Sequence, residues 1–229
     1  MSEQLTGISS MATRLLLAEL VQDYERLSGQ PVVVRSVGGV DAARRVESGE
    51  GFDFVVLAAD VIDWLEAAGH VVSGSRVDVA RSGVAIAVAS GAPRPDVVTE
   101  AALRDAVLAA RSIGYSTGPS GSHLTRLFER WGIADAIAPR VVQAPPGVPV
   151  GALVARGDVE LGFQQLSELM HLPGIDVIGR MPAEVQIVTV FSAGICTASG
   201  KQDVAKAFLS FLASSQCDKA RLNQGMEPV

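Results

Sequence analysis

The 229-residue sequence contains few of the residues that metal and redox sites require. It has two cysteines, Cys196 and Cys217, whose spacing matches no metal-ligand pattern, and three scattered histidines. A pair of free thiols buried in an apolar core is the expectation for such cysteines. The sequence therefore predicts no metal site and no cofactor.

Basic residues and long apolar runs are also scarce. The chain has 19 Lys and Arg against 25 Asp and Glu, a net charge of −6. Proteins that bind nucleic acids instead present a basic surface to the phosphates. No apolar run is long enough to span a bilayer. We therefore expect no nucleic-acid partner and no insertion into a membrane.

The N-terminal residues MSEQLTGISSM lack the basic start and the apolar stretch of a signal peptide. As the sequence stands, this favours a cytoplasmic protein. A periplasmic location remains the alternative if an export signal was removed from the chain.

Short apolar runs, by contrast, are abundant, and 48% of the residues are hydrophobic. These runs alternate with amphipathic patterns, which predicts an α/β fold whose mostly parallel, mixed sheets are covered by helices. The expected strands are Leu5–Ile8, Pro31–Ser36, Phe52–Ala58, Gly83–Ala89, Ile113–Ser116, Arg140–Gln143, Val159–Gln164 and Val185–Cys196. The expected helices follow Ser10, Gly39 and Ser120 and cover Asp60–Ala68 and Val204–Leu212.

Two long apolar strands interrupt this alternation at either end of a second α/β block. They are Gly83–Ala89 and Val185–Cys196. This order predicts two lobes, with the long strands as the hinge. One lobe would comprise residues 1–82 and 191–229, and the other residues 83–190.

Four polar stretches follow predicted strands, at the position where open α/β sheets bind their ligands. Two stretches belong to each predicted lobe, so that an anion between the lobes could take donors from both. Hydroxyls and the backbone N–H groups of helix N-termini suit such an anion. The candidate ligand-binding residues are Ser9, Ser10, Gly38, Gly39, Ser116, Thr117, Ser120, Gly121, Ser122, Gln164 and Gln165.

The richest of these stretches lies in GYSTGPSGSHLTRLFERWGI, residues 114–133. No Lys precedes Ser122, which excludes a nucleotide-binding P-loop. Four hydroxyls and two glycines within eight positions are more than a turn needs, and this favours a ligand. Purely structural roles remain open elsewhere, since Ser10 would serve as a helix cap and Gly38-Gly39 as a tight turn.

His123 is the candidate for acid–base chemistry. In the first turn of a helix, the positive end of the helix dipole would favour a neutral imidazole that acts as a base or a hydrogen-bond donor. The alternative is a side chain that points into solvent. Arginines near the four stretches could also pair with a carboxylate. They are Arg14, Arg35, Arg44, Arg45 and Arg126, of which Arg44 and Arg45 are expected to be solvated.

The layout resembles the type II periplasmic binding proteins, closest to the molybdate-binding group of ABC-transporter solute-binding proteins. The resemblance covers nearly the whole chain and implies two α/β lobes that close on an oxyanion. It rests on five stretches in the family's order: Ser9-Ser10 opening the first helix, ARRVESGEGFDFVVLAAD (Ala43–Asp60), SRVDVARSGVAIAV (Ser75–Val88), GYSTGPSGSHL from Gly114, and GDVELGFQQ (Gly157–Gln165).

The chain departs from this family at two places. The second loop of the family normally offers serines, where this sequence has Gly38, Gly39 and Val40. A tyrosine is common in the family where Gln165 stands here. Together with His123, these departures favour an organic carboxylate over molybdate as the ligand.

The resemblance implies two possible functions. A binding protein would capture a small anion, with the permease of an ABC transporter as its partner only if the chain is exported. Some relatives resemble enzymes such as aconitate isomerase, and the missing signal peptide favours a cytoplasmic isomerase that moves a proton on a di- or tricarboxylate. In that case His123 would be the base, and the orienting donors would be Ser10, Ser116, Thr117, Ser120 and Gln165.

Overall fold

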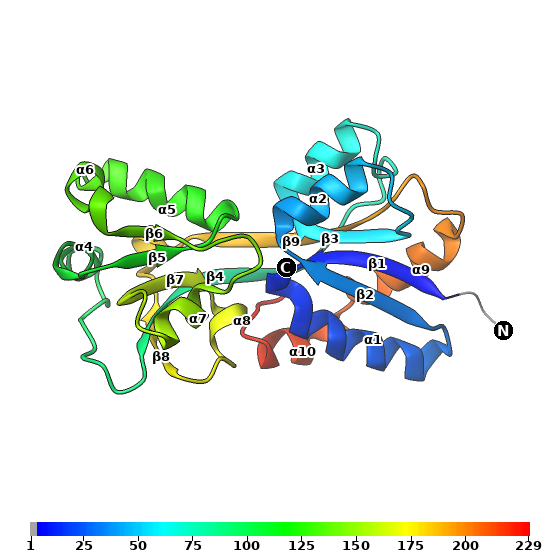
Figure 1. Cartoon of the computed structure of the whole chain (residues 1–229). Coiled ribbons are helices and arrows are strands. Elements are labelled where there is room, and N and C mark those ends of the chain that lie inside the picture. Colours follow the sequence, from blue (N-terminus) through cyan, green and yellow to red (C-terminus); the bar gives the residue numbers. More distant parts are fainter. Residues whose placement is uncertain (1–3) are drawn as a thin grey trace. The chain divides into compact units, whose positions relative to one another are not determined.

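The computed structural model describes residues 4–229 (Figure 1). The internal contacts of the chain divide it into two compact units. Unit 1 comprises the described residues up to Arg81 together with Val190–Val229, and unit 2 comprises Ser82–Thr189.

The chain passes from one unit to the other within two strands. The first passage lies in β4 (Val77–Ala89), between Arg81 and Ser82, and the second in β9 (Val188–Ile195), between Thr189 and Val190. β4 begins at Val77, six residues before the start expected from the sequence.

A mostly parallel sheet with the strand order β2-β1-β3-β9 forms the centre of unit 1. β1 (Leu5–Ser10) pairs in parallel with β2 (Val32–Val37) and with β3 (Phe54–Ala58). β3 pairs antiparallel with β9. Every residue of β3 is buried, which explains why its sequence is a continuous apolar run and not an alternating one.

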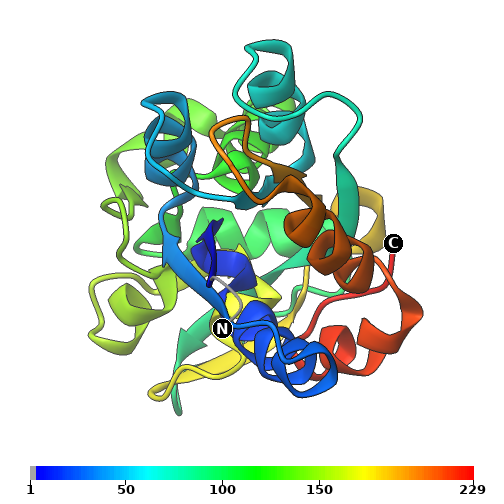
Figure 2. The same ribbon diagram turned by 90° about the vertical axis from the view of Figure 1, so that its right-hand side faces the viewer.

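Helices cover both faces of this sheet (Figures 1 and 2). α1 (Arg14–Ser28), α9 (Gln202–Leu212) and α10 (Asp218–Asn223) pack on one face. α2 (Gly39–Glu47) and α3 (Ala59–Ala67) pack on the other. These helices therefore shield both faces of the sheet from water.

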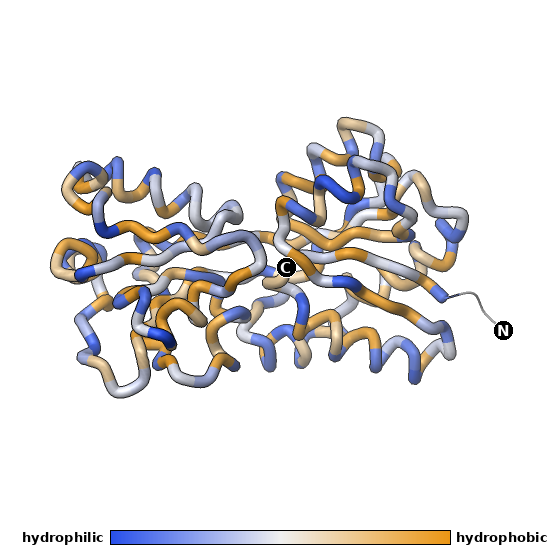
Figure 3. Tube along the Cα trace, in the orientation of Figure 1, coloured by the Kyte–Doolittle hydropathy of each residue, from blue (hydrophilic) through white to orange (hydrophobic). Residues whose placement is uncertain are grey.

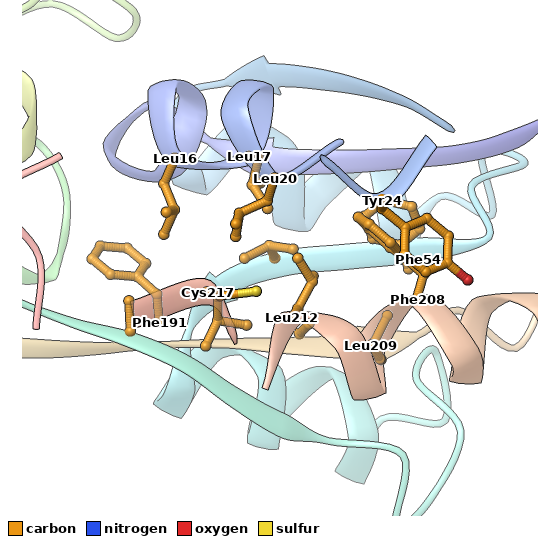
Figure 4. Close-up of a cluster of buried hydrophobic side chains, with 14 of the residues drawn as sticks. Leu16, Leu17, Leu20, Tyr24, Phe54, Phe191, Phe208, Leu209, Leu212 and Cys217 are labelled. Atoms are coloured by element: carbon orange, nitrogen blue, oxygen red, sulfur yellow. The ribbon is translucent and has the colours of Figure 1, made fainter. Parts of the chain in front are cut away.

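Aromatic side chains fill the core beneath α1 and α9 (Figure 4). The ring of Phe208 lies 4.9 Å from that of Tyr24 and 5.0 Å from that of Phe54, measured between centroids. Such pairs add about 0.5–1.5 kcal/mol each beyond the burial of their area. Gly7 allows this packing, because a Cβ atom there would lie 2.2 Å from Cζ of Phe54.

The sheet of unit 2 is mixed, with the strand order β8-β4-β7-β5-β6. β5 (Ile113–Tyr115) pairs in parallel with β6 (Val141–Gln143) and with β7 (Leu161–Gln165). β4 pairs antiparallel with β7 and with β8 (Ile175–Arg180), a strand that the sequence did not predict.

Two sets of helices cover this second sheet. α4 (Glu100–Ala109), α5 (Pro119–Arg130) and α6 (Ala134–Ile137) pack on the face that includes Val84 and Ile86. α7 (Val150–Ala155) and α8 (Leu166–Leu169) lie on the opposite face. Within residues 4–229, 3₁₀ turns complete the elements: η1 (Met11–Thr13), η2 (Ala138–Arg140), η3 (Ala183–Val185) and η4 (Ser215–Cys217).

The predicted α/β class is confirmed. Figure 3 shows hydrophobic residues along the strands, whereas hydrophobic and hydrophilic residues alternate along the helices. Cys196 and Cys217 are buried free thiols, as expected, and burial raises the pKa of Cys196 to about 12. Over residues 4–229, none of the helices combines the length and the apolar character that crossing a bilayer requires.

A buried carboxylate, Asp53, joins the start of β1 to the loop before α9. It accepts hydrogen bonds from the backbone N–H of Thr6 at 2.8 Å and from the hydroxyl of Ser199 at 2.8 Å, and the Lys201 ammonium lies 3.5 Å away. Burial acts to raise the pKa of Asp53, but the hydrogen bonds and the charge of Lys201 outweigh it, so that the pKa lies below its usual value.

We expect Asp53→Asn to lower the free energy of unfolding at pH 7 by about 1–3 kcal/mol, because a charged acceptor of buried donors is lost. A carboxylate with a depressed pKa stabilises the fold above its unfolded-state pKa of about 3.9, and this stabilisation is lost as the pH falls toward the folded-state pKa. Urea unfolding between pH 7 and pH 3 should therefore show a shallower acid loss for the variant than for the wild type.

The exposed Asp105 provides the matched control, and Asp105→Asn should follow the wild type across this range. An acid loss in Asp53→Asn as steep as that of the wild type would contradict the role given to Asp53.

Candidate functional site

In unit 1, polar residues gather where β1 and β2 end. Parallel pairing places Ser9 opposite Ser36 and Ser10 opposite Val37. The hydroxyls of Ser9 and Ser36 lie 2.8 Å apart, and Ser9 also donates to the carbonyl of Ser10 at 3.3 Å. Ser9 thus uses its hydrogen bonds to join the two strand ends.

Ser10 differs from its neighbour. Its hydroxyl is buried and has no hydrogen-bond partner. It does not cap the following 3₁₀ turn, so the helix-cap alternative is wrong. A buried hydroxyl without a partner costs about 1–3 kcal/mol, which a ligand or an ordered water would offset.

The first turn of α2 lies beside Ser10, because a Cβ atom on Gly39 would come 3.8 Å from Cβ of Ser10. Gly38 occupies the N-cap position of this helix, and no side chain caps it. The free N–H groups and the positive end of the helix dipole favour an anion at this end. Since Gly38 and Gly39 have no side chains, nothing of their own obstructs these donors.

In unit 2, the loop after β5 leads directly into α5. Gly118 is the N-cap residue without a side-chain cap, and Pro119 occupies the first helical position, where its missing N–H is not needed. Ser120 is buried and Ser116 is half-buried, whereas Thr117 and Ser122 are exposed. The structure therefore distinguishes among the four predicted hydroxyls.

Gly121 is required by close packing. A Cβ atom at this position would lie 1.9 Å from the backbone oxygen of Ser116, which is far inside contact distance. Glycine thus lets the first turn of α5 fold back on the loop that precedes it. The residue shapes the site by its lack of a side chain.

Gln164 and Gln165 end β7 and point to opposite faces, because successive residues of a strand alternate. Gln164 donates to Glu168 at 2.8 Å and accepts from the N–H of Gly151 at 3.3 Å, and is therefore engaged within the protein. Gln165 donates from its amide nitrogen to the hydroxyl of Thr189 at 2.9 Å. Its Oε1 is buried and has no partner.

The register of the sheet places Gln165 on the face that α5 covers. Gln165 lies opposite Val84, and two residues earlier Phe163 lies opposite Ile86. Val84, Ile86 and Phe163 all belong to the core packed against α5. Gln165 and Ser120 therefore belong to the same face of unit 2.

Two further buried hydroxyls without partners, those of Ser82 and Ser167, were not predicted from the sequence. Ser82 stands at the start of the apolar run SGVAIAV, and Ser167 lies two residues after Gln165. In the sequence, the position of Ser82 directly before an apolar run was the signal that could have identified it.

The position of His123 differs from the expectation. It is the fifth residue of α5, beyond the first turn, and its side chain is exposed. With Arg126 and Arg130 it lines a groove of about 320 Å³ against residues 184–187. The exposed side chain of His123 thus agrees with the alternative, in which it points into solvent.

The candidate arginines are mostly exposed. Arg45 is an exception, because its guanidinium pairs with Glu50 and lies 5.6 Å from the centroid of the Phe52 ring. The exposed members are Arg14, Arg35, Arg44 and Arg126. In the part of the chain that the structure describes, no group of three or more His, Cys, Asp and Glu residues is arranged to bind a metal ion.

Comparisons with known proteins agree on the family and the fold. The profile of the family described as bacterial extracellular solute-binding protein matches residues 5–227. A Pseudomonas sp. protein named aconitate isomerase is 36% identical over 231 residues, which cover 98% of this chain and 88% of that protein.

Among solved structures, the periplasmic molybdate-binding protein of Azotobacter vinelandii superposes with a TM-score of 0.80 at 20% identity, covering 97% of this chain and 98% of that one. The structure titled tungstate ABC transporter from Geobacter sulfurreducens gives a TM-score of 0.78 at 17% identity, covering 96% and 98%. At these identities, the likeness shows a shared fold.

We expect Gly121→Ala to destabilise the protein by about 1–3 kcal/mol, because the added methyl group forces the Ser116 carbonyl and the first turn of α5 apart. Gly118→Ala is the matched control, since its Cβ atom would make ordinary contact at 3.7 Å with Oγ of Ser116. Urea unfolding should separate the two variants. Equal stabilities would contradict the close packing at Gly121.

Proposed function

The chain belongs to the bacterial extracellular solute-binding protein family, and on this premise we propose that it binds a small anion, specifically an organic carboxylate. The observation that supports this most is that the buried Ser10 hydroxyl and the Gln165 amide oxygen have no partners in the protein. A bound solute supplies partners for both. That one solute serves the donors of both units stays a prediction.

The donors proposed for the anion are uncharged. They are the N–H groups in the first turn of α2, the N–H of Ser120 in α5, and the side chains of Ser10, Ser116, Thr117, Ser120 and Gln165. The N–H groups of Gly121 and Ser122 already donate to the carbonyl of Gly118. Helix N-termini bind anions without a cationic side chain, because several backbone dipoles point at the charge. The attraction is therefore local to these donors and does not come from the net charge of the protein, which is −6.

Gln165 supports an organic acid as the solute. Its amide offers both a donor and an acceptor, and the Thr189 hydroxyl can pair with either end. The amide can therefore present its oxygen to a hydroxyl or a protonated carboxyl group, or its nitrogen to a carboxylate. A fully ionised tetrahedral oxyanion has no proton to donate, so it would pair only with the amide nitrogen.

A second candidate function is an isomerase that acts by proton transfer on a di- or tricarboxylate. The supporting observation is the 36% identity, over 98% of the chain, to the protein named aconitate isomerase. Such a reaction needs a base near the acidic carbon and donors that fix the carboxylates. His123 is the proposed base, and the donors are those proposed for binding.

The two functions differ in the partner and the location that they require. A transport role requires export of the chain and an ABC permease as the partner that receives the solute. An isomerase requires neither and acts wherever its substrate is found, including the cytoplasm.

The solute is identified by a thermal-shift screen of citrate, cis- and trans-aconitate, succinate, sulfate, phosphate, molybdate and tungstate. We expect a tricarboxylate or dicarboxylate to stabilise the protein, by about 2.7 kcal/mol at a hundred times its Kd. Stabilisation by molybdate or tungstate alone would refute the carboxylate.

The isomerase candidate is tested by proton NMR of trans-aconitate incubated with the protein in D₂O. We expect interconversion of the aconitate isomers and deuterium incorporation in the wild type, and a loss of about 10²–10⁴-fold in His123→Ala, the usual contribution of a general base. His70→Ala is the control and should retain the wild-type rate. Binding without turnover would leave transport as the function, and full turnover in His123→Ala would exclude His123 as the base.

A further inference from the structure

Unit 2 contains a group of buried polar side chains whose hydrogen bonding is incomplete. Ser82, Gln165, Ser167 and Thr189 are 1%, 4%, 5% and 9% exposed, and we refer to them as the polar cluster. The hydroxyls of Ser82 and Ser167 and Oε1 of Gln165 are buried without a partner.

The strand register brings Ser82, Gln165 and Thr189 to one place. Gln165 lies opposite Val84 on β4, and Ser82, two residues before Val84, points to the same face as Gln165. On the other side of β4, the N–H of Val84 donates to the carbonyl of Ile187 at 3.1 Å, and continuing this antiparallel register places Thr189 beside Ser82.

Ser167 extends the cluster on the side of β7. It lies two residues beyond Gln165 in the chain, in the first turn of α8, which follows β7 directly. Gln165 connects the two sides of the cluster through its 2.9 Å hydrogen bond to Thr189.

Apolar side chains of similar size would serve better if the polar cluster were only part of a core. A buried polar atom that loses its water and gains no partner destabilises the folded state, and native proteins leave few such atoms. Three of them in one cluster indicate that a bound group completes their hydrogen bonds.

The chemistry of the cluster defines that group. Its four side chains are uncharged, and hydroxyls can both donate and accept. The Gln165 amide can also turn, because the Thr189 hydroxyl pairs with either of its ends. Such a set matches the oxygen atoms of a carboxyl or hydroxyl group.

We propose that the polar cluster binds oxygen atoms of the solute, with Ser82 and Ser167 as direct contacts and Thr189 as the residue that positions Gln165. With the carboxylate solute proposed above, on which this part of the inference rests, the bound oxygens are those of a carboxyl group.

Ser82→Ala and Ser167→Ala test the direct contacts. Each variant should lower the affinity for trans-aconitate by about five- to tenfold, the effect of one lost hydrogen bond, as measured by isothermal titration calorimetry. Each should also raise the Tm of the solute-free protein, because an unpartnered buried hydroxyl has been removed.

Ser192→Ala is the matched control. The Ser192 hydroxyl is fully buried as well, but it donates to Asp78 at 2.6 Å. Its loss should lower the Tm and leave the affinity unchanged, which is the opposite of the result expected for Ser82 and Ser167.

Thr189→Val and Thr189→Ser test the positioning role. Thr189→Val should weaken binding about as much as Ser82→Ala does, because it removes the hydroxyl that bonds to Gln165. Thr189→Ser keeps this hydroxyl and should bind with the affinity of the wild type. A structural role for the threonine methyl group would give the reverse order.

An unchanged affinity in Ser82→Ala and Ser167→Ala would overturn the inference, and a lowered Tm would show that the cluster binds only a structural water. If the wild type binds molybdate and no carboxylate, the same variants are titrated with molybdate. Failure of the carboxylate proposal is then distinguishable from failure of the polar cluster.

Discussion

The functional features of this protein depend on buried hydrogen-bonding atoms that the protein itself does not satisfy. Two neighbouring pairs show this most clearly. Ser9 bonds to Ser36 while the hydroxyl of Ser10 has no partner, and Gln164 bonds to Glu168 while Oε1 of Gln165 has none. Within each pair one side chain is structural and the other is available, because adjacent residues at the end of a strand face opposite sides. The end of each strand thus both holds the fold together and presents a group to a ligand.

The apolar cores offset the free-energy cost of these unsatisfied groups. In unit 1 helices cover both faces of the sheet, and each face has its own apolar core, of which the one beneath α1 and α9 contains most of the aromatic rings. Unit 2 repeats this arrangement with a mixed sheet. A free energy of folding of several kcal/mol is the small difference between large terms, so a few unpartnered groups are tolerated only where packing elsewhere is complete. Glycines contribute at close approaches, where Gly7 admits the ring of Phe54 and Gly121 admits the carbonyl of Ser116.

The fold and the solute are separate questions for this family. The chain superposes well on molybdate-binding and tungstate-transporter structures that share only 17–20% of its sequence, whereas the relative named aconitate isomerase is 36% identical. A shared fold therefore does not by itself fix the solute. Here Gly38 and Gly39 leave the first turn of α2 without side chains of its own, and Gln165 supplies an amide that both donates and accepts. Such local features, more than the fold, bear on the choice of solute.

The sequence by itself determined the α/β class, most of the strands and the stretches that follow them, because burial period and turn residues are local signals. Those signals also placed Ser9, Ser10, Gln164 and Gln165 among the candidate ligand-binding residues. They did not separate Ser10 from Ser9 or Gln165 from Gln164, since the identity of each partner depends on which strands pair and in which register. The short strand β8 was missed, and His123 was expected one turn too early. Ser82 and Ser167 were missed because a single serine carries no periodic signal. Only the tertiary structure decided which polar atoms remain without a partner, because that property belongs to the completed set of contacts and to no residue alone.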